Sequence, residues 1–135
     1  MICLDTNIAI YVINRRVPSV RHRLAEQLRL GTEIGFSAVA LFELRYGHVR
    51  SDRRAEAERL LAEFLAPGIV VLPFDAEDAT HAGEIRAHLE SKGTPIGPYD
   101  YLIAAQARCR GATLATANRR EIERVPGLMV ADWAA

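Results

Sequence analysis

The chain has 135 residues, and its 17 basic and 17 acidic side chains cancel to a formal net charge of zero. This length suits one domain and leaves no room for a linker and a second core, so we expect a single domain over residues 1–135. The charge balance excludes a protein that coats nucleic acid through an overall basic field. Two cysteines exclude a disulfide scaffold and a four-cysteine zinc site.

The first half of the chain alternates short apolar runs with helical patterns. The sequence predicts a buried strand at residues 1–4, helices at 6–13 and 17–30, a brief strand at 35–36 and a helix from 37 to about 46. Ser37 is a typical N-cap for the last of these helices, and Gly47 is expected to end it.

The second half continues the alternation. Asp52 precedes an amphipathic helix, whose apolar positions recur at helical spacing until Pro67 and Gly68 stop it. The sequence then predicts a strand at 69–72, helices at 75–91 and 98–110, a strand at 113–116, a helical turn at 119–123 and an edge strand at 128–130. Strands that alternate with helices indicate an α/β fold with a mainly parallel sheet.

Three carboxylates break this pattern. Asp5 directly follows the first strand, and Glu43 and Asp100 lie on helix stripes of small apolar residues that should face the core. For Glu43 the stripe is Val39, Ala40, Tyr46 and Gly47, and for Asp100 it is Ile103, Ala104 and Ala107. An acid in such a place must be paired, protonated or bound to a cation, because burying an isolated charge costs several kcal/mol or more.

Two interpretations of these acids stay open on the pattern alone. In one, they converge at the carboxyl edge of the sheet and bind a hard cation such as Mg²⁺, which suits hydrolysis of a phosphodiester. In the other, each has its own role: Asp5 caps a helix, Glu43 pairs with Arg45 or another arginine, and Asp100 favours its helix N-terminus. The spacing does not show whether the acids meet.

The chain resembles the PIN-domain ribonucleases, and more narrowly the VapC toxins of the VapBC type II toxin–antitoxin systems. Four motifs carry the resemblance, in family order and over essentially the whole chain. They are Leu4-Asp5-Thr6-Asn7, Phe42-Glu43-Leu44-Arg45-Tyr46-Gly47, Ile96-Gly97-Pro98-Tyr99-Asp100-Tyr101-Leu102-Ile103-Ala104-Ala105, and Thr116-Ala117-Asn118-Arg119-Arg120-Glu121-Ile122 followed by Val125-Pro126-Gly127-Leu128.

The resemblance implies one PIN domain, a three-layer α/β/α sandwich with a small, mainly parallel central sheet. It also implies a metal-dependent endoribonuclease that cuts tRNA or rRNA. Asp5, Glu43 and Asp100 would be both the catalytic residues and the ligands of Mg²⁺ or Mn²⁺. Many PIN domains carry a fourth acid where this chain has Asn118, which keeps an oxygen ligand but loses the charge, and Glu121 lies one helical turn later to compensate.

Supporting roles follow for several neighbours of these acids. Thr6, Asn7 and Thr116 could hydrogen-bond the acidic cluster, although threonine and asparagine also favour helix starts and strand ends. Arg119 and Arg120 adjoin the predicted site and are candidates for RNA contact, although solvated helix faces explain most arginines.

The resemblance further implies a homodimer and a cognate VapB-like antitoxin that docks in an exposed groove between the early helices. No run of about 18 apolar residues occurs, so we expect no membrane contact and a cytoplasmic location. Two rival functions remain, each separable by experiment. One is another Mg²⁺-dependent phosphohydrolase acting on DNA or nucleotides, and the other is a catalytically weak PIN-like module that only binds RNA or protein.

Overall fold

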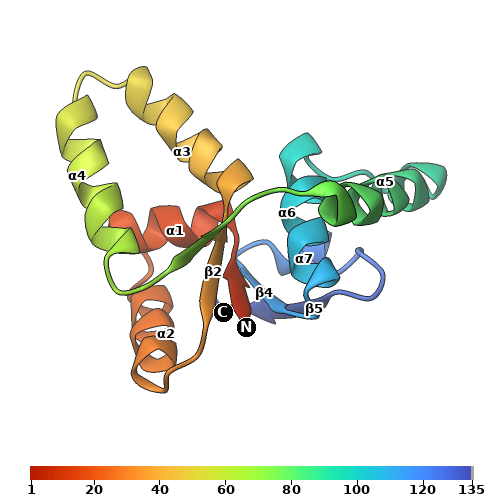
Figure 1. The fold of residues 1–135 in the computed structure, drawn as a ribbon, viewed down its shortest axis with the longest axis horizontal. Coiled ribbons are helices and arrows are strands. Elements are labelled where there is room, and N and C mark those ends of the chain that lie inside the picture. Colours follow the sequence, from red (N-terminus) through yellow and green to blue (C-terminus); the bar gives the residue numbers. More distant parts are fainter. Residues whose placement is uncertain (135) are drawn as a thin grey trace.

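The computed structural model describes residues 1–134 (Figure 1). Its elements in chain order are β1 (Ile2–Leu4), α1 (Thr6–Ile13), α2 (Pro18–Arg29), β2 (Ile34–Ser37), α3 (Ala38–Val49), α4 (Arg54–Leu65), β3 (Val70–Leu72), α5 (Ala76–Ser91), α6 (Pro98–Cys109), β4 (Thr113–Thr116), α7 (Arg119–Ile122) and β5 (Met129–Asp132). None of the described helices is long and apolar enough to cross a membrane.

The five strands form one sheet in the order β3-β2-β1-β4-β5, and every pairing is parallel. Helices α1 to α4 cover one face and α5 to α7 cover the other (Figure 1), as right-handed crossovers require when the strand order reverses direction after β3. The predicted three-layer α/β/α sandwich is therefore confirmed, with a fully parallel sheet.

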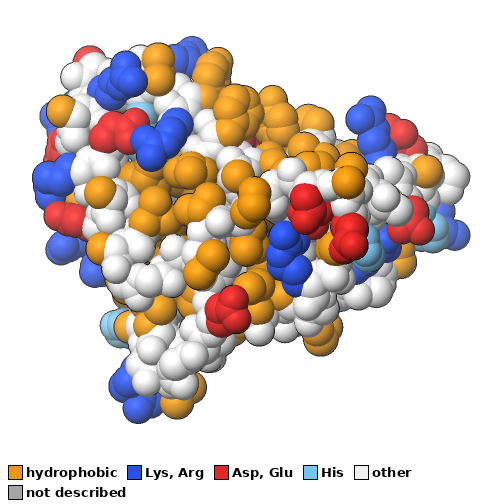
Figure 2. Space-filling view, viewed as in Figure 1, with side chains coloured by type: hydrophobic (Ala, Val, Ile, Leu, Met, Phe, Trp, Pro, Cys, Tyr) orange, Lys and Arg blue, Asp and Glu red, His pale blue; other side chains and the backbone are white. Residues whose placement is uncertain are grey.

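The core lies between the sheet and these helices. Leu4, Ile34, Phe36 and Leu114 are almost completely buried on the inner strands, as expected for a parallel sheet with both faces covered. Phe36 meets Phe64 of α4 edge to face, with ring centroids 5.5 Å apart. Charged side chains of both signs are interspersed on the outer surface of α4 (Figure 2), in keeping with the zero net charge.

The element boundaries mostly agree with those predicted, with two corrections. Gly47 does not end α3, which continues to Val49; a glycine costs a helix interior only about 1 kcal/mol, and packing of α3 against α1 and α4 outweighs that cost. The last strand runs to Asp132, beyond the predicted end at Val130, because its pairing with β4 extends to Thr116.

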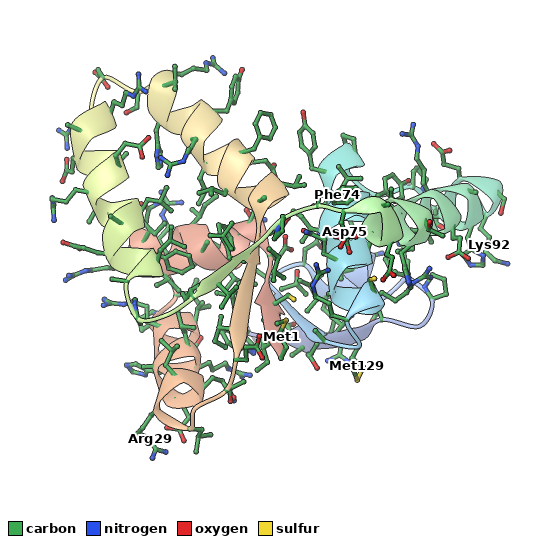
Figure 3. All side chains as sticks on the ribbon, in the orientation of Figure 1. Met1, Arg29, Phe74, Asp75, Lys92 and Met129 are labelled. Carbon is green, nitrogen blue, oxygen red and sulfur yellow. The ribbon has the colours of Figure 1, made fainter. Side chains whose placement is uncertain are left out.

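Two reciprocal hydrogen bonds fix the start of helix α5. Asp75 caps it, and its carboxylate accepts from the backbone N–H of Asp78 at 2.9 Å. The Asp78 carboxylate accepts from the backbone N–H of Asp75 at 3.0 Å, which completes a reciprocal capping box. Figure 3 labels Asp75 at the start of this helix and Lys92 just past its end.

Candidate active site

The candidate site begins at the point where the strand order reverses, between β1 and β4. Asp5 follows β1 directly and is 5% exposed. Its Oδ1 accepts the backbone N–H of Thr6 at 2.8 Å, and its Oδ2 accepts the hydroxyl of Thr116 at 2.9 Å. Asp5 thus caps α1, and it also points into the crevice where parallel sheets bind ligands.

Glu43 reaches the same place from α3. The Ser37 hydroxyl accepts the backbone N–H of Val39 at 3.0 Å and so fixes the start of this helix. The Thr6 hydroxyl donates to Glu43 Oε1 at 3.0 Å. The alternative of a Glu43–Arg45 ion pair is wrong, since Arg45 pairs with Glu58 instead.

Asp100 completes the group from the first turn of α6. Pro98 begins this helix, and Asp100 is its third residue. Partial burial, together with the charges of Asp5, Glu43 and Glu121, raises the pKa of Asp100 to about 6. Four carboxylates from four separate segments are therefore close enough to repel one another.

These acids have no ion-pair partner in the described part of the chain: Asp5, Glu43 and Asp100 make no ion pair with arginine, lysine or histidine. Burial is the main cause that raises the pKa of Asp5 and of Glu43, against the lowering effect of the threonine hydrogen bonds. The site is an acidic crevice in need of positive charge.

The donor set fits a hard divalent cation, since its oxygens come from carboxylates and hydroxyls. In the described part of the chain, no three His, Cys, Asp or Glu side chains are already arranged so that they could hold a metal ion. The carboxylates would therefore have to move closer together around an ion, which mutual repulsion opposes until the ion is present.

The remaining predicted residues fall into two groups. Thr6 and Thr116 contact the carboxylates directly, whereas Asn7 is exposed and donates no hydrogen bond to them among the described residues. Asn118 is partly buried, and its backbone N–H donates to the Thr116 hydroxyl at 2.9 Å. Glu121 lies near enough to Asp100 to raise its pKa.

The two candidate RNA contacts are both exposed on α7. Arg119 forms a surface ion pair with Glu123 at 3.3 Å, so part of its charge is offset. In residues 1–134, Arg120 has no ion pair.

Two features of the site differ from or go beyond the sequence interpretation. Tyr46 was expected to face the core but is 56% exposed, because the inward positions of α3 are Ala40 and Leu44. Gly97 was not singled out, yet a Cβ at this position would lie 2.7 Å from Asp100 Oδ2. The signal was in the sequence: a glycine and a proline stand immediately before the acid-bearing turn.

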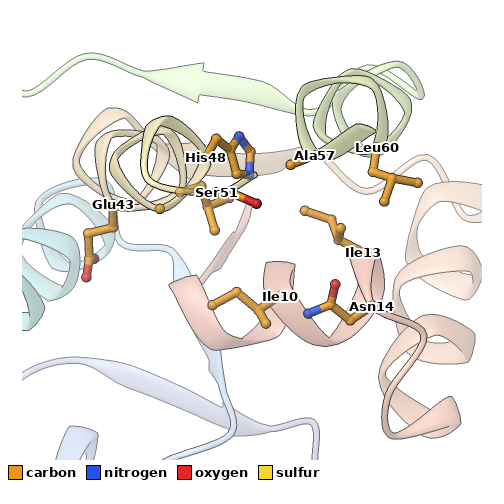
Figure 4. A pocket seen from close by; sticks show the side chains of 10 residues that line it. Ile10, Ile13, Asn14, Glu43, His48, Ser51, Ala57 and Leu60 are labelled. Atoms are coloured by element: carbon orange, nitrogen blue, oxygen red, sulfur yellow. The ribbon is translucent and has the colours of Figure 1, made fainter. Parts of the chain in front are cut away.

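A groove leads away from the site between α1, α3 and α4 (Figure 4). It has a volume of about 350 Å³ and includes Glu43 at one end. The other lining residues are Ile10, Ile13, Asn14, Leu44, Gly47, His48, Ser51, Ala57 and Leu60. The predicted groove between the early helices therefore exists, and it shares a residue with the acidic crevice.

Comparisons with known proteins agree with this geometry. The PIN domain family model matches residues 2–128. The tRNA(fMet)-specific endonuclease VapC of Shigella flexneri is 44% identical over 131 residues, which are 97% of this chain and 96% of that protein. Ribonuclease VapC2 of Rickettsia felis is 38% identical over 130 residues, with 96% of each chain covered.

Solved structures point the same way. The crystal structure of VapBC2 from Rickettsia felis, bound to a DNA fragment from their promoter, superposes with a TM-score of 0.91 at 36% identity, and the match covers 98% of this chain and 99% of that one. DNA-bound VapBC from Salmonella typhimurium gives a TM-score of 0.88 at 37% identity, covering 98% and 97%. The predicted resemblance is confirmed, and the chain belongs to the VapC group of the PIN domain family.

Proposed function

We propose that this chain is a metal-dependent endoribonuclease, a single PIN domain over residues 1–135 that acts as the toxin of a type II toxin–antitoxin pair. The observation that carries the proposal is the meeting of Asp5, Glu43 and Asp100 at one crevice without an ion-pair partner among the described residues. The names of its relatives, ribonuclease VapC2 and tRNA(fMet)-specific endonuclease VapC, support it.

Asp5, Asp100 and Glu43 would hold the ion, and Mg²⁺ or Mn²⁺ suits an all-oxygen set of this kind. When bound, such an ion acts as a Lewis acid that lowers the pKa of a water molecule and offsets the charge of a phosphodiester. Asn118 and Glu121 stand at the edge of this set, where they would contribute an amide oxygen and a further charge.

The chain's own residues prepare the reaction by fixing the acids. Thr116 and the Thr6 backbone N–H occupy one lone pair on each oxygen of Asp5, which orients this carboxylate. The Thr6 hydroxyl holds Glu43 so that its second oxygen is free to accept a proton of the attacking water. That water forms the new bond to phosphorus, the bond to O3′ breaks, and the products carry a 5′-phosphate and a 3′-hydroxyl.

Substrate binding needs positive charge outside the crevice. With the three site acids set aside, 17 basic residues remain against 14 acidic ones, a difference of +3. Arg119 and Arg120 lie just after β4 on the sheet edge that holds the acids, so we assign them to phosphates of the RNA. A folded RNA recognised by shape requires less bulk charge than non-specific coating, which favours tRNA. A nuclease that cuts tRNA would act in the cytoplasm.

The groove between α1, α3 and α4 is the proposed docking site of a VapB-type antitoxin. Its apolar lining suits an amphipathic segment, and because Glu43 lines one end, the end of such a segment would reach the acidic crevice and block it. Binding of the antitoxin in the groove would then by itself inhibit RNA cleavage.

Cleavage of purified RNAs by antitoxin-free protein tests the activity. We expect initiator tRNA to be cut into discrete fragments with Mg²⁺ or Mn²⁺, with no cutting in EDTA or by Asp5→Asn. Asp52→Asn, which changes an exposed acid outside the site, should cut as the wild type does. Cleavage of DNA or nucleotides alone would favour the phosphohydrolase, and RNA binding without cleavage in either metal would favour the binding module.

A further inference from the structure

A cluster of exposed basic side chains surrounds the connection between α1 and α2, and the proposed reaction does not use it. We define the α1–α2 patch as Arg15, Arg16, Arg21 and His22, all of which are exposed. Three of them, Arg15, Arg21 and His22, line a hollow of about 360 Å³, whose other lining side chains are a proline and an alanine. Figure 1 shows this connection at the end of α1 that points away from the sheet.

The three arginines of the patch have no ion-pair partner in the described part of the chain. An adjoining hollow is lined by Arg15, Arg21 and the acid Glu63. Glu63, however, forms an ion pair with Arg59 at 2.8 Å. Guanidinium groups that are held together without a counter-charge repel one another and attract an anion.

The backbone holds Arg15 in a conformation that favours glycine. Helix α1 ends in a Schellman motif, in which the N–H of Arg15 donates to the Val12 carbonyl at 3.3 Å and the N–H of Arg16 donates to the Tyr11 carbonyl at 3.0 Å. Arg15 therefore has a φ of 55°. Helices α2, α5 and α6 end in the same motif, and each has a glycine at the equivalent position, namely Gly31, Gly93 and Gly111. An arginine is strained at this position, and such strain is common where a side chain serves a ligand.

We propose that the α1–α2 patch binds backbone phosphates of the RNA, outside the segment that is cut, an inference that rests on the proposed function. Guanidinium groups bind phosphate through paired hydrogen bonds, and such contacts position a nucleic acid without reading its sequence. Helix α1 separates the patch from Asp5, and its eight residues span about 12 Å at 1.5 Å per residue. The patch thus contacts RNA beyond the scissile bond, which favours a large folded substrate over a short one.

The chemistry of the hollow favours RNA over an acidic segment of a protein. A helical or extended peptide needs apolar anchors, and the hollow offers only Pro18 and Ala25 beside its basic side chains. The groove between α1, α3 and α4 does offer such anchors, among them Ile10, Ile13 and Leu60. Phosphates require only hydrogen-bond donors and positive charge, which the patch supplies.

Binding of fluorescein-labelled initiator tRNA tests the patch by fluorescence anisotropy, with antitoxin-free protein in EDTA so that no RNA is cut. The double variant Arg15→Gly, Arg21→Gln should bind about tenfold more weakly than the wild type, about threefold for each exposed charge pair lost. The slope of log Kd against log salt concentration should fall by about two, one for each phosphate contact. Lys92→Gln, which removes an exposed positive charge just past α5, should bind as the wild type does.

Arg15→Gly alone separates loss of a contact from loss of the fold. Because glycine adopts a positive φ without strain, this variant should melt about 3 °C higher than the wild type. It should nevertheless bind tRNA about threefold more weakly. Weaker binding by a more stable protein cannot be attributed to misfolding, whereas a melting temperature below that of the wild type would contradict the strain at Arg15.

An unchanged Kd and salt slope in the double variant would overturn the proposal. If that variant also fails to bind a co-expressed VapB-type antitoxin, the patch belongs to an acidic segment of that protein. A wild type that binds tRNA more tightly than the double variant but cuts no RNA would refute the proposed function and leave the patch. A wild type that cuts tRNA while the double variant binds it equally well would refute the patch alone.

Discussion

At the scale of one residue, Asp100 shows how the acidic crevice lowers the stability of the folded protein. Partial burial and the charges of Asp5, Glu43 and Glu121 raise its pKa to about 6. At neutral pH the carboxylate is thus ionised in an environment that disfavours the charge. Functional sites commonly lower the stability of the fold in this way, so removal of the charge should stabilise the protein while it abolishes the function.

We expect Asp100→Asn to raise the stability of the metal-free protein at pH 7.5 by about 1–2 kcal/mol. A shift of two pKa units corresponds to nearly 3 kcal/mol, reduced because the side chain is partly solvated. The folded-state pKa is above the ordinary 3.8, so wild-type stability falls as the pH rises from about 4 through 6. Urea unfolding in EDTA should show that Asp100→Asn is more stable than the wild type at pH 7.5 but not at pH 4. An equal increase in stability at both pH values would exclude this electrostatic cause.

Gly97 leaves the space in which the Asp100 carboxylate lies. Its φ of −58° and ψ of 148° suit any residue, yet a Cβ would lie 2.7 Å from Asp100 Oδ2. Gly97→Ala should therefore rotate the Asp100 carboxylate and slow RNA cleavage at least about tenfold, with a melting temperature near that of the wild type. Gly83→Ala, on a helix with open space around the position, is the control. Full activity in Gly97→Ala would show that the carboxylate tolerates the displacement.

At the scale of elements, the packing of α5 on α6 depends on a buried ion pair that the sequence patterns did not predict. Asp78 is fully buried, and its Oδ1 lies 2.8 Å from Nη1 of Arg110. Although burial alone would raise the pKa of Asp78, its hydrogen bonds to Arg110 and the Asp75 backbone hold that pKa below the usual value. Helical periodicity could not show this pair, because Asp78 has the sequence context of a solvated first-turn acid.

Arg110→Met should therefore destabilise the fold by about 3 kcal/mol at pH 7, because it leaves a buried carboxylate unpaired. A lowered folded-state pKa contributes stability above the ordinary pKa that is lost as the pH falls through the folded-state value. The difference between wild type and variant should accordingly shrink below pH 4 in urea titrations. Arg59→Met removes an exposed pair with Glu63 and should cost about 0.5 kcal/mol or less. Similar losses in both variants would contradict this account.

Element prediction worked where local chemistry decides the outcome. Ser37 and Pro98 mark helix starts by capping and by fixed φ, and the structure has both. It failed where packing decides, since Gly47 continues a helix that it was expected to end. Tertiary contacts outweigh a propensity of about 1 kcal/mol at such positions.

At the scale of the whole molecule, the acids could be singled out from the sequence but their meeting could not. Asp5, Glu43 and Asp100 each stood out as an acid on an apolar pattern. Only the reversal of strand order, with β1 beside β4, brings them to one crevice. Tyr46 was assigned to the core because periodicity shows that a helix has an apolar face but not how many apolar faces it has. Helix α3 has two, one with the buried Ala40 and Leu44 and one with the exposed Tyr46.

The groove between α1, α3 and α4 gives a last prediction, which concerns inhibition rather than catalysis. Ala57 of α4 lines it, whereas Ala62 of the same helix is exposed. Ala57→Trp should fill the groove and weaken binding of a co-expressed VapB-type antitoxin at least about tenfold, so the variant stays toxic where the wild type is neutralised. Ala62→Trp should be neutralised normally, and both variants should cut RNA alike once freed of antitoxin. Normal neutralisation of Ala57→Trp would move the docking site to another surface, such as the hollow on α3 and α6 that Phe42, Glu43, Tyr46 and Tyr99 line.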